Sequence, residues 1–388
     1  MAIPLSTNTT SGVAPLCWQP KHCPRFFTFV ARLAHNTRSQ QRERRAFDLN
    51  TTLTGIALNV QSLAESQPCF CSYIYTNVPD LEAVPGLRVA DALRALHPSV
   101  IAAPFPKLSR NRWGDPTVSW NALSFAKLDV AVLHLVRGEK VIWTDVDTLL
   151  VYGLQHAYRK LPNFVVCDKS MEDARAGRGC YGDLWMVDPP LAAAVYSDVA
   201  RLPNSQLPPH DLQGIFTRLL ARGGENGARL HNLVKETGAM CWGFDFAGHN
   251  HPYAVNSSIL LPHHPGETRI ALAADAIGGP LRCSLPERPG PMLPVGAMSF
   301  TWPSFKEMMR RPEALWYGPG VRRWFTRTYC EERAASRGWN PLASVCRRAA
   351  DCTLEPPCIE RARSTSVTNW SALFQQALNR PILARVSV

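Results

Sequence analysis

Two aspartates one residue apart, Asp145 and Asp147, follow the short apolar stretch VIW at 141–143. Such a stretch is typical of a buried β-strand, so both carboxylates are expected at its carboxyl end. Two carboxylates on one loop can hold Mg²⁺ or Mn²⁺, whose other positions go to water and substrate phosphates. The ion neutralises a departing diphosphate, which suits transfer from a nucleotide-activated donor. The alternative is a plain turn whose carboxylates cap the next element or meet basic side chains.

The elements around this pair predict an α/β protein. Alternating strands and helices are the signature of a parallel sheet with crossover helices, and ligands bind beyond the carboxyl ends of its strands. Asp145 and Asp147 lie at such an end. A glycine, Gly138, suits the C-cap of the helix that precedes them. Strands are predicted over 25–33, 69–78, 99–105, 164–168, 184–188 and 257–264, and helices over 52–66 and 120–136.

The segment AKLDVAVLHLVRGEKVIWTDVDTLLV, residues 126–151, resembles the helix, strand and D-x-D segment of family 8 glycosyltransferases, the glycogenin-like enzymes. In that family a Lys-Leu pair begins the helix segment and D-x-D-T-L ends the strand. Lys127-Leu128 and the run from Asp145 to Leu149 match, with a slightly longer gap between them. The resemblance implies a GT-A fold, which is a Rossmann-like, mostly parallel sheet with flanking helices. It also implies a nucleotide-sugar donor, usually UDP-linked, Mn²⁺ or Mg²⁺ as cofactor, and retention of anomeric configuration.

The second anchor of that family is H-x-x-G-x-x-K, and LPHHPGETRI has its spacing with arginine in place of lysine. The resemblance implies that His263 completes the metal site, while Gly266 and Arg269 meet the diphosphate. Arginine can clamp phosphate through two donors, so the replacement is chemically reasonable. Lys127 is implied to contact donor sugar or phosphate. The alternatives are a surface-loop histidine beside a Pro-Gly turn and a lysine that extends from a buried helix to solvent.

Candidates for the reaction centre follow the same resemblance more loosely. The family's Asn-Ser/Ala-Gly strand corresponds to GDLWMVDPP, which offers Asp183 without the asparagine. The family's later Asp-Gln pair corresponds to HDLQGIF, where Gln213 fits and Asp211 is displaced by one residue. Asp183, Asp211 and Gln213 are therefore predicted to orient sugar and acceptor. For Asp211, a helix N-cap is the alternative.

The chain is expected to contain an irregular tail (1–24), a GT-A domain (25–285) and a Pro/Arg/Cys-rich extension (286–388), with the resemblance covering roughly 25–275. Cysteines crowd the extension with fifteen, five and five residues between them, which fits zinc-binding pairs poorly. We therefore expect at least one disulfide among these four cysteines. They are Cys330, Cys346, Cys352 and Cys358.

Composition bounds the partners and the compartment. The 388 residues carry 42 Lys+Arg against 31 Asp+Glu, a formal charge of +11, and a basic surface favours anionic partners such as nucleotides. No nucleic-acid-binding motif accompanies that charge, and no apolar run approaches the roughly 20 residues of a membrane helix. The N-terminus lacks the pattern of a signal peptide, so we expect either a cytoplasmic protein or a chain that lacks a leader it once had. The twelve cysteines and four N-x-[ST] sequons favour the secretory lumen, such as the Golgi, and we prefer that compartment.

Two rival functions share the acidic pair. The catalytic motif of a haloacid-dehalogenase-like phosphatase is also a D-x-D after a strand. That motif requires Thr or Val at the position of Leu149, and it usually lies near the N-terminus. The second rival function is that of a catalytically degenerate GT-A domain, which binds a glycan or protein without catalysis. The intact D-x-D argues against the degenerate domain, and the loosely matched middle segment argues for it.

Overall fold

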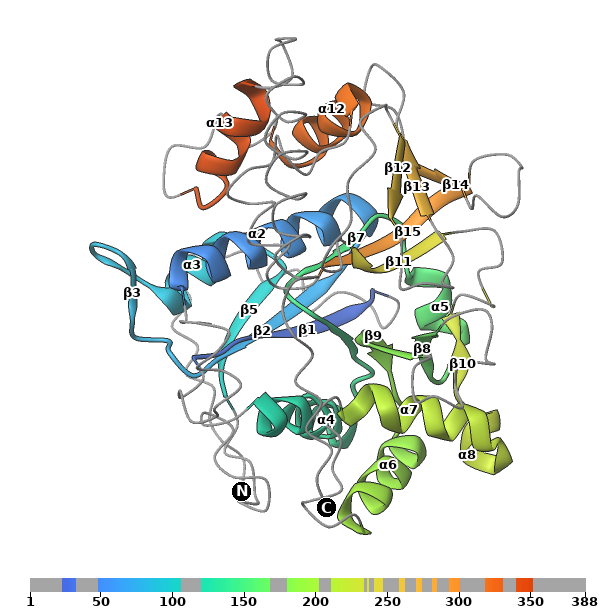
Figure 1. Ribbon diagram of the computed structural model, residues 1–388. Coiled ribbons are helices and arrows are strands. Elements are labelled where there is room, and N and C mark those ends of the chain that lie inside the picture. The colour runs from blue at the N-terminus through green and yellow to red at the C-terminus, as the bar shows by residue number, and fades with distance from the viewer. Residues whose placement is uncertain are drawn as a thin grey trace, which may run out of the picture.

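The computed structural model describes residues 23–32, 48–105, 120–167, 180–201, 211–233, 236, 241–246, 258–261, 270–273, 281–284, 293–300, 318–330 and 340–351. Within these residues, a seven-stranded sheet in the order β10-β8-β9-β6-β1-β2-β5 forms the centre of the fold (Figure 1). Its strands are β1 (Arg25–Val30), β2 (Cys71–Thr76), β5 (Val100–Pro104), β6 (Ile142–Thr144), β8 (Phe164–Cys167), β9 (Cys180–Met186) and β10 (His231–Asn232).

The sheet is mostly parallel, as predicted. β1 pairs in parallel with both β2 and β6, and β2 pairs in parallel with β5, whereas β9 runs antiparallel between β6 and β8. The chain moves outward from β1 through β2 to β5 and then returns to the other side of β1 as β6. The winding direction therefore reverses between β1 and β6. Such a reversal is the topological switch point at which open α/β sheets bind ligands.

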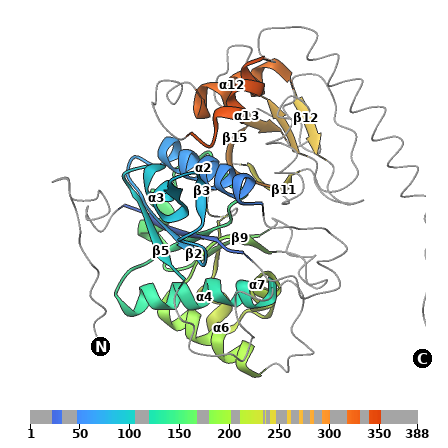
Figure 2. The ribbon, with the colours of Figure 1, turned by 90° about the vertical axis from the view of Figure 1, so that its left-hand side faces the viewer.

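Helices cover both faces of this sheet (Figures 1 and 2). β1 accordingly buries apolar side chains on both sides, with Phe26 in the core under α2 and Phe27 in the core under α4. Strands buried on both faces lack the apolar–polar alternation of half-exposed strands, as RFFTFV illustrates. One face carries α2 (Leu49–Ser66) and α3 (Val89–Ala95), and the other carries α4 (Trp120–Val136), α6 (Pro189–Arg201) and α7 (Asp211–Arg222).

A second sheet in the order β11-β15-β14-β13-β12 lies beside the first, and β7 joins it by pairing antiparallel with β15. β7 begins at Thr148, directly after the acidic pair, so the turn at 145–147 links a strand of one sheet to a strand of the other. The predicted boundary at residue 285 falls between β14 and β15, which are hydrogen-bonded neighbours. The strands are β7 (Thr148–Leu150), β11 (Cys241–Phe246), β12 (Ser258–Leu261), β13 (Ile270–Ala273), β14 (Arg282–Ser284) and β15 (Leu293–Phe300).

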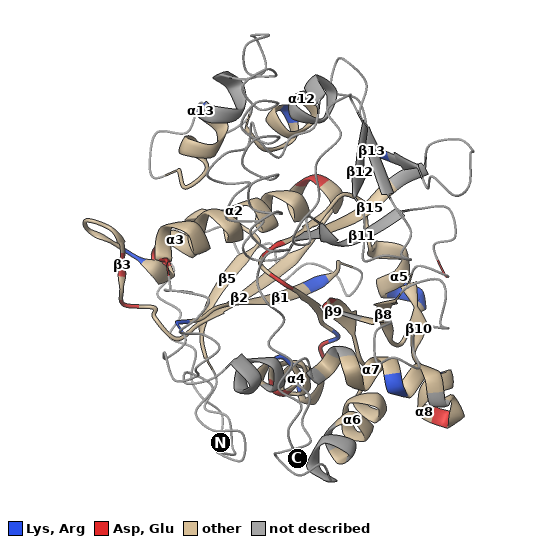
Figure 3. Ribbon diagram, in the orientation of Figure 1, with Lys and Arg blue, Asp and Glu red and all other residues tan. Residues whose placement is uncertain are grey.

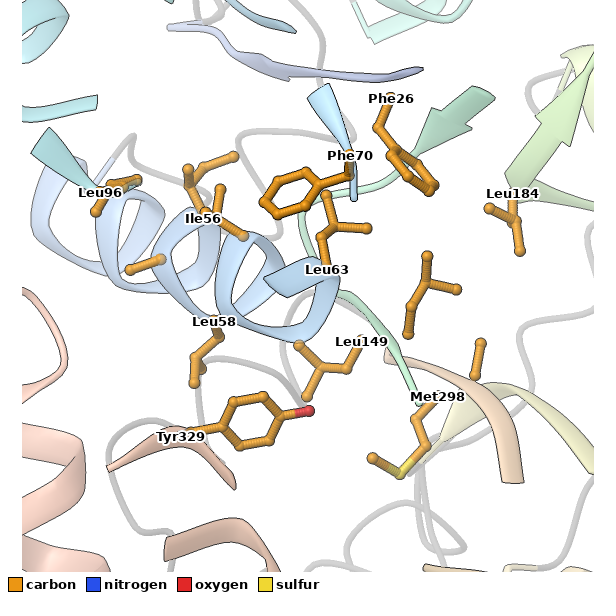
Figure 4. Close-up of a cluster of buried hydrophobic side chains, with 14 of the residues drawn as sticks. Phe26, Ile56, Leu58, Leu63, Phe70, Leu96, Leu149, Leu184, Met298 and Tyr329 are labelled. Atoms are coloured by element: carbon orange, nitrogen blue, oxygen red, sulfur yellow. The ribbon is translucent and has the colours of Figure 1, made fainter. Parts of the chain in front are cut away.

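Two C-terminal helices, α12 (Gly318–Tyr329) and α13 (Ala343–Asp351), lie over α2 on the side away from the central sheet (Figure 2). A disulfide between Cys330 and Cys346 links them, which confirms the expected disulfide in this region. Tyr329 is buried in one cluster with Leu58 of α2 and Leu149 of β7 (Figure 4). The C-terminal helices therefore share a core with the elements next to the acidic pair.

Helix α4, which carries Lys127, matches the predicted helix at 120–136. Gly138 has a φ of +74°, the left-handed conformation expected after a helix C-terminus, and the Glu139 N–H donates to His134 O (2.9 Å). The buried His134 ring lies 2.8 Å from Tyr75 Oη through Nε2 and 2.7 Å from Glu139 Oε2 through Nδ1. These contacts anchor the end of α4 to β2 of the sheet.

The remaining short elements within the described part of the chain are β3 (Glu82–Val84), β4 (Leu87–Arg88), α5 (Gln155–Lys160) and α8 (Gly224–Ala228). None of the described helices combines the length and apolarity that crossing a bilayer requires. Those Lys and Arg residues that the structure describes lie on several separate elements, such as β1, α5 and α7 (Figure 3).

Candidate active site

The acidic pair lies in a hydrogen-bonded turn at the carboxyl end of β6. Asp145 O accepts from the Thr148 N–H (3.1 Å), which closes a four-residue turn around Val146 and Asp147. The Asp145 N–H donates to Asp183 O on β9 (2.9 Å). Both aspartates are only partly exposed. The backbone of this turn is therefore fixed on the strand side and by its own closing hydrogen bond, at the switch point of the sheet.

Strand alternation sends neighbouring side chains of β6 to opposite faces of the sheet. Ile142 packs in the core under α2, and Trp143 packs in the core under α4. The Thr144 side chain points to the same face as Ile142 and contacts Asn59 of α2. The Asp145 side chain points to the same face as Trp143 and contacts Lys127 of α4.

Helix α4 places a positive charge against Asp145 of the acidic pair. Lys127 Nζ lies 2.8 Å from Asp145 Oδ1, and the two side chains are 12% and 23% exposed. The same ammonium lies 4.4 Å from the centre of the Trp143 ring, within the range of a cation–π interaction. Together Asp145, Asp147 and Lys127 carry two formal negative charges and one positive charge. The formal charges of these three groups alone sum to −1.

Asp183 lies next to the acidic turn because the antiparallel pairing of β6 with β9 continues past Thr144–Leu184 to Asp145, and on its other side β9 pairs irregularly with β8. The β8–β9 pairing passes from Val165–Trp185 to Val166–Tyr181 and so skips residues 182–184 of β9. Such bulges are frequent beside active sites because they redirect side chains. The structure thus joins Asp183 to Asp145 through the backbone hydrogen bond given above.

Asp211 and Gln213 occupy the first turn of α7, and their side chains lie outside the described residues. The helix is fixed to β9 because Thr217 Oγ1 accepts from the Cys180 N–H (3.0 Å). Cys180 also forms a disulfide with Cys167 on the neighbouring strand β8. These contacts join α7 to the edge of the sheet that carries Asp183, and the roles of Asp211 and Gln213 stay predictions.

The second predicted anchor, with His263, Gly266 and Arg269, belongs to the connection between β12 and β13 and lies outside the described residues. In the part of the chain that the structure describes, no group of three His, Cys, Asp or Glu side chains is arranged to hold a metal ion. Of the three predicted metal ligands, Asp145 and Asp147 are described and lie on one turn, and the role of all three, His263 included, stays a prediction.

Sequence reasoning missed Asn59, which contacts the acidic turn from α2. Its side chain is fully buried and donates to the backbone on both sides of Asp147. The available signal was an asparagine inside the apolar helical segment GIALNVQSL. A buried amide needs hydrogen-bond partners, but the sequence alone does not say which backbone groups they are.

No protein-family model and no curated protein matches the chain. The solved structures to which it is similar include the glycosyltransferase GlyE of Streptococcus pneumoniae TIGR4, at 10% identity and a TM-score of 0.34, over 56% of this chain and 47% of that one. Mouse xyloside xylosyltransferase 1 in its apo form is 11% identical with a TM-score of 0.36, over 54% of this chain and 84% of that one. The bifunctional glycosyltransferase WbbM is 13% identical with a TM-score of 0.29, over 55% of this chain and 39% of that one. The chain thus spans about half the length of GlyE. Because these TM-scores are low, the functional argument rests on the site residues.

Proposed function

We propose that this chain is a metal-dependent glycosyltransferase of the GT-A type, similar to family 8, that transfers a hexose from a UDP-linked donor to an acceptor hydroxyl with retention. The supporting observation is the acidic turn at Asp145–Thr148, which lies at the switch point of a mostly parallel sheet. A ligand at this point contacts the carboxyl ends of β1 and β6 and the turn between the two sheets.

The residues of the turn fit a divalent cation. Asp145 and Asp147 supply carboxylate oxygens, the donors that Mg²⁺ and Mn²⁺ take in proteins. His263 is proposed as a further ligand, and an imidazole nitrogen favours Mn²⁺ over the harder Mg²⁺. When bound, the ion would supply positive charge to the diphosphate of the donor.

The other proposed roles belong to side chains around the turn. The Lys127 ammonium lies at the acidic turn and can exchange its contact with Asp145 for a phosphate oxygen of the donor. Arg269 and Gly266 are proposed to hold the diphosphate, and positive charge there stabilises the departing UDP oxygen. The sugar of the nucleotide donor is proposed to be oriented by Asp183, Asp211 and Gln213. The same residues are proposed to orient the acceptor, which is a hydroxyl group of a glycan or protein.

The proposed compartment is the lumen of the secretory pathway, such as the Golgi. The described residues contain the disulfides Cys23–Cys69, Cys167–Cys180 and Cys330–Cys346. Disulfides of this kind form and persist in oxidising compartments and are rare in the cytosol. Protein for functional assays is therefore best produced in a secretory host.

The deciding experiment measures UDP binding by titration calorimetry with and without Mn²⁺ and then screens UDP-sugars for transfer and hydrolysis. Asp145→Asn and Asp147→Asn are expected to abolish Mn²⁺-dependent UDP binding, because each removes a charged oxygen ligand. Asp80→Asn is the matched control, since Asp80 is 84% exposed and pairs only loosely with Arg88 (3.5 Å).

Three other results would contradict the proposal. Wild-type affinity for UDP and Mn²⁺ in both turn variants would exclude the metal site at the turn. Binding without transfer or hydrolysis of any donor would favour a catalytically degenerate binding domain. Phosphate release from phosphomonoesters, without use of nucleotide sugars, would favour the phosphatase alternative.

A further inference from the structure

Asn59 lies in the middle of α2 with no exposed surface, between the buried residues Leu58 and Val60. A buried amide is costly unless it forms hydrogen bonds, so its partners indicate why an amide is present. Its Nδ2 donates to Thr148 O (2.7 Å) and Asp145 O (3.2 Å), and it lies 3.3 Å from Thr144 Oγ1. The two carbonyl groups belong to the first and last residues of the acidic turn.

These contacts determine which way the Asn59 amide is oriented. Both carbonyl oxygens are acceptors, so a nitrogen must face them, and an amide nitrogen carries two hydrogens for this purpose. The Thr144 hydroxyl also reaches Asp145 O (3.4 Å) and adds a second donor there. Asn59 Oδ1 is buried and has no hydrogen-bond partner among the described residues. A buried oxygen without a hydrogen bond costs stability. An asparagine at this position despite that cost indicates that the hydrogen bonds of its nitrogen are needed.

We infer that Asn59 is a positioning residue for the acidic turn, and this inference rests on the proposed function. By holding both carbonyl groups of the turn on the α2 side of the sheet, it fixes the backbone that presents Asp145 and Asp147. The Asp145 side chain is directed to the opposite face, toward Lys127. Groups that orient metal ligands without touching the metal commonly affect affinity as strongly as some ligands do.

Ser62 of the same helix provides a matched control. It is fully buried, its Oγ accepts from the Leu150 N–H (3.1 Å), and it donates to Asn59 O (2.7 Å). Ser62 therefore holds β7 beyond the turn and does not touch the carbonyl groups of Asp145 or Thr148. A change at Ser62 removes a buried hydrogen bond between the same two elements but leaves the turn itself in place.

The experiment compares Asn59→Leu, Asn59→Ser and Ser62→Ala with the wild-type chain. Leucine keeps the branched shape of asparagine but removes the donor, whereas serine leaves room for water at the carbonyl groups. Urea unfolding with a chelator gives the stability of each variant, and calorimetry gives the affinity for UDP with Mn²⁺. Asn59→Leu is expected to lower that affinity about 10- to 100-fold. Ser62→Ala is expected to lose stability while its affinity stays within about twofold of wild type.

The outcomes separate the inference from the function on which it rests. If Asn59→Leu does not fold, Asn59→Ser takes its place and is expected to lose affinity about tenfold relative to Ser62→Ala. Equal affinities in the folded Asn59 variants and Ser62→Ala, with a wild-type protein that binds, overturn the inference alone. A wild-type protein that does not bind UDP with Mn²⁺ overturns the proposed function and the positioning role together.

Discussion

The ion pair between Lys127 and Asp145 leads to a prediction of stability. Methionine has nearly the length of lysine, so Lys127→Met removes the ammonium and keeps most of the packing. Breaking a fully buried ion pair costs about 3–5 kcal/mol, and breaking an exposed one costs about 0–1 kcal/mol. The two side chains are 12% and 23% exposed, which places this pair between those limits. With the cation–π contact to Trp143 included, we expect Lys127→Met to lower the free energy of unfolding by about 2–3 kcal/mol.

A surface pair in the same protein serves as control. Arg94 and Asp91 have the same 2.8 Å separation, but their side chains are 56% and 55% exposed. Arg94→Met should therefore cost no more than about 0.5 kcal/mol. Both variants are measured by urea unfolding followed by tryptophan fluorescence, with a chelator present so that no divalent cation contributes. Because the separation is equal in the two pairs, the difference between the variants reports the combined effect of burial and of the cation–π contact to Trp143.

A second measurement on Lys127→Met tests whether the lysine and a cation use the same carboxylate. The ammonium contacts Asp145 Oδ1, so its removal should raise the affinity for Mn²⁺ without nucleotide about tenfold, which equals about 1.4 kcal/mol. Affinity for UDP with Mn²⁺ should instead fall, because the proposed phosphate contact is lost. If Lys127→Met is no less stable than Arg94→Met, and its Mn²⁺ affinity equals that of wild type, Lys127 does not compensate the acidic turn.

Two further predictions concern other parts of the chain. Cys346→Ser removes the disulfide to Cys330, which closes a loop with a sequence separation of 16, and should destabilise the C-terminal helices by about 3 kcal/mol. Peptide mapping without reduction should recover the Cys330–Cys346 peptide, and free thiols at both positions would contradict this pairing. Burial raises the pKa of Asp129 to about 6, so its ionised form is disfavoured in the folded state. Asp129→Asn should therefore be more stable at pH 7 by on the order of 2 kcal/mol, and this gain should disappear as the pH falls from about 6 to about 4. A gain that is independent of pH would show that Asp129 does not titrate in this way.

Elements with strong local signals were predictable from the sequence. The apolar run at 120–136, followed by Gly138, predicted α4 with the bounds that the structure has. The strands predicted around 25–33 and 99–105 correspond to β1 and β5, and their parallel arrangement followed from the helices between strands. Local patterns sufficed because each element buries a nearly continuous apolar segment. The place of the acidic pair was predictable in the same way, since Asp145 and Asp147 follow the apolar segment at 141–143, which forms most of β6, whereas their role as metal ligands stays a prediction.

The second sheet could not be predicted, because its pairing is distant in sequence. β7 has three residues, Thr148–Leu150, and pairs with Ala297–Ser299 of β15, far along the chain. A segment of three residues carries no usable period, and no local feature of 148–150 indicates its partner. The same limit applies to Cys23, whose partner is Cys69, because disulfide connectivity does not follow from spacing.

The contacts that hold the acidic turn depend both on local sequence patterns and on the packing of elements that are distant in sequence. Lys127 and Asp145 were each recognisable in the sequence, yet their contact follows only when α4 is placed on one face of the sheet and α2 on the other. Strand alternation then directs Asp145 to Lys127 and Thr144 to Asn59. The turn is thus held by side chains from two layers and continues into a second sheet. A substitution on either helix can therefore change the position of the carboxylates without touching them, and the Lys127 and Asn59 variants test the two layers separately.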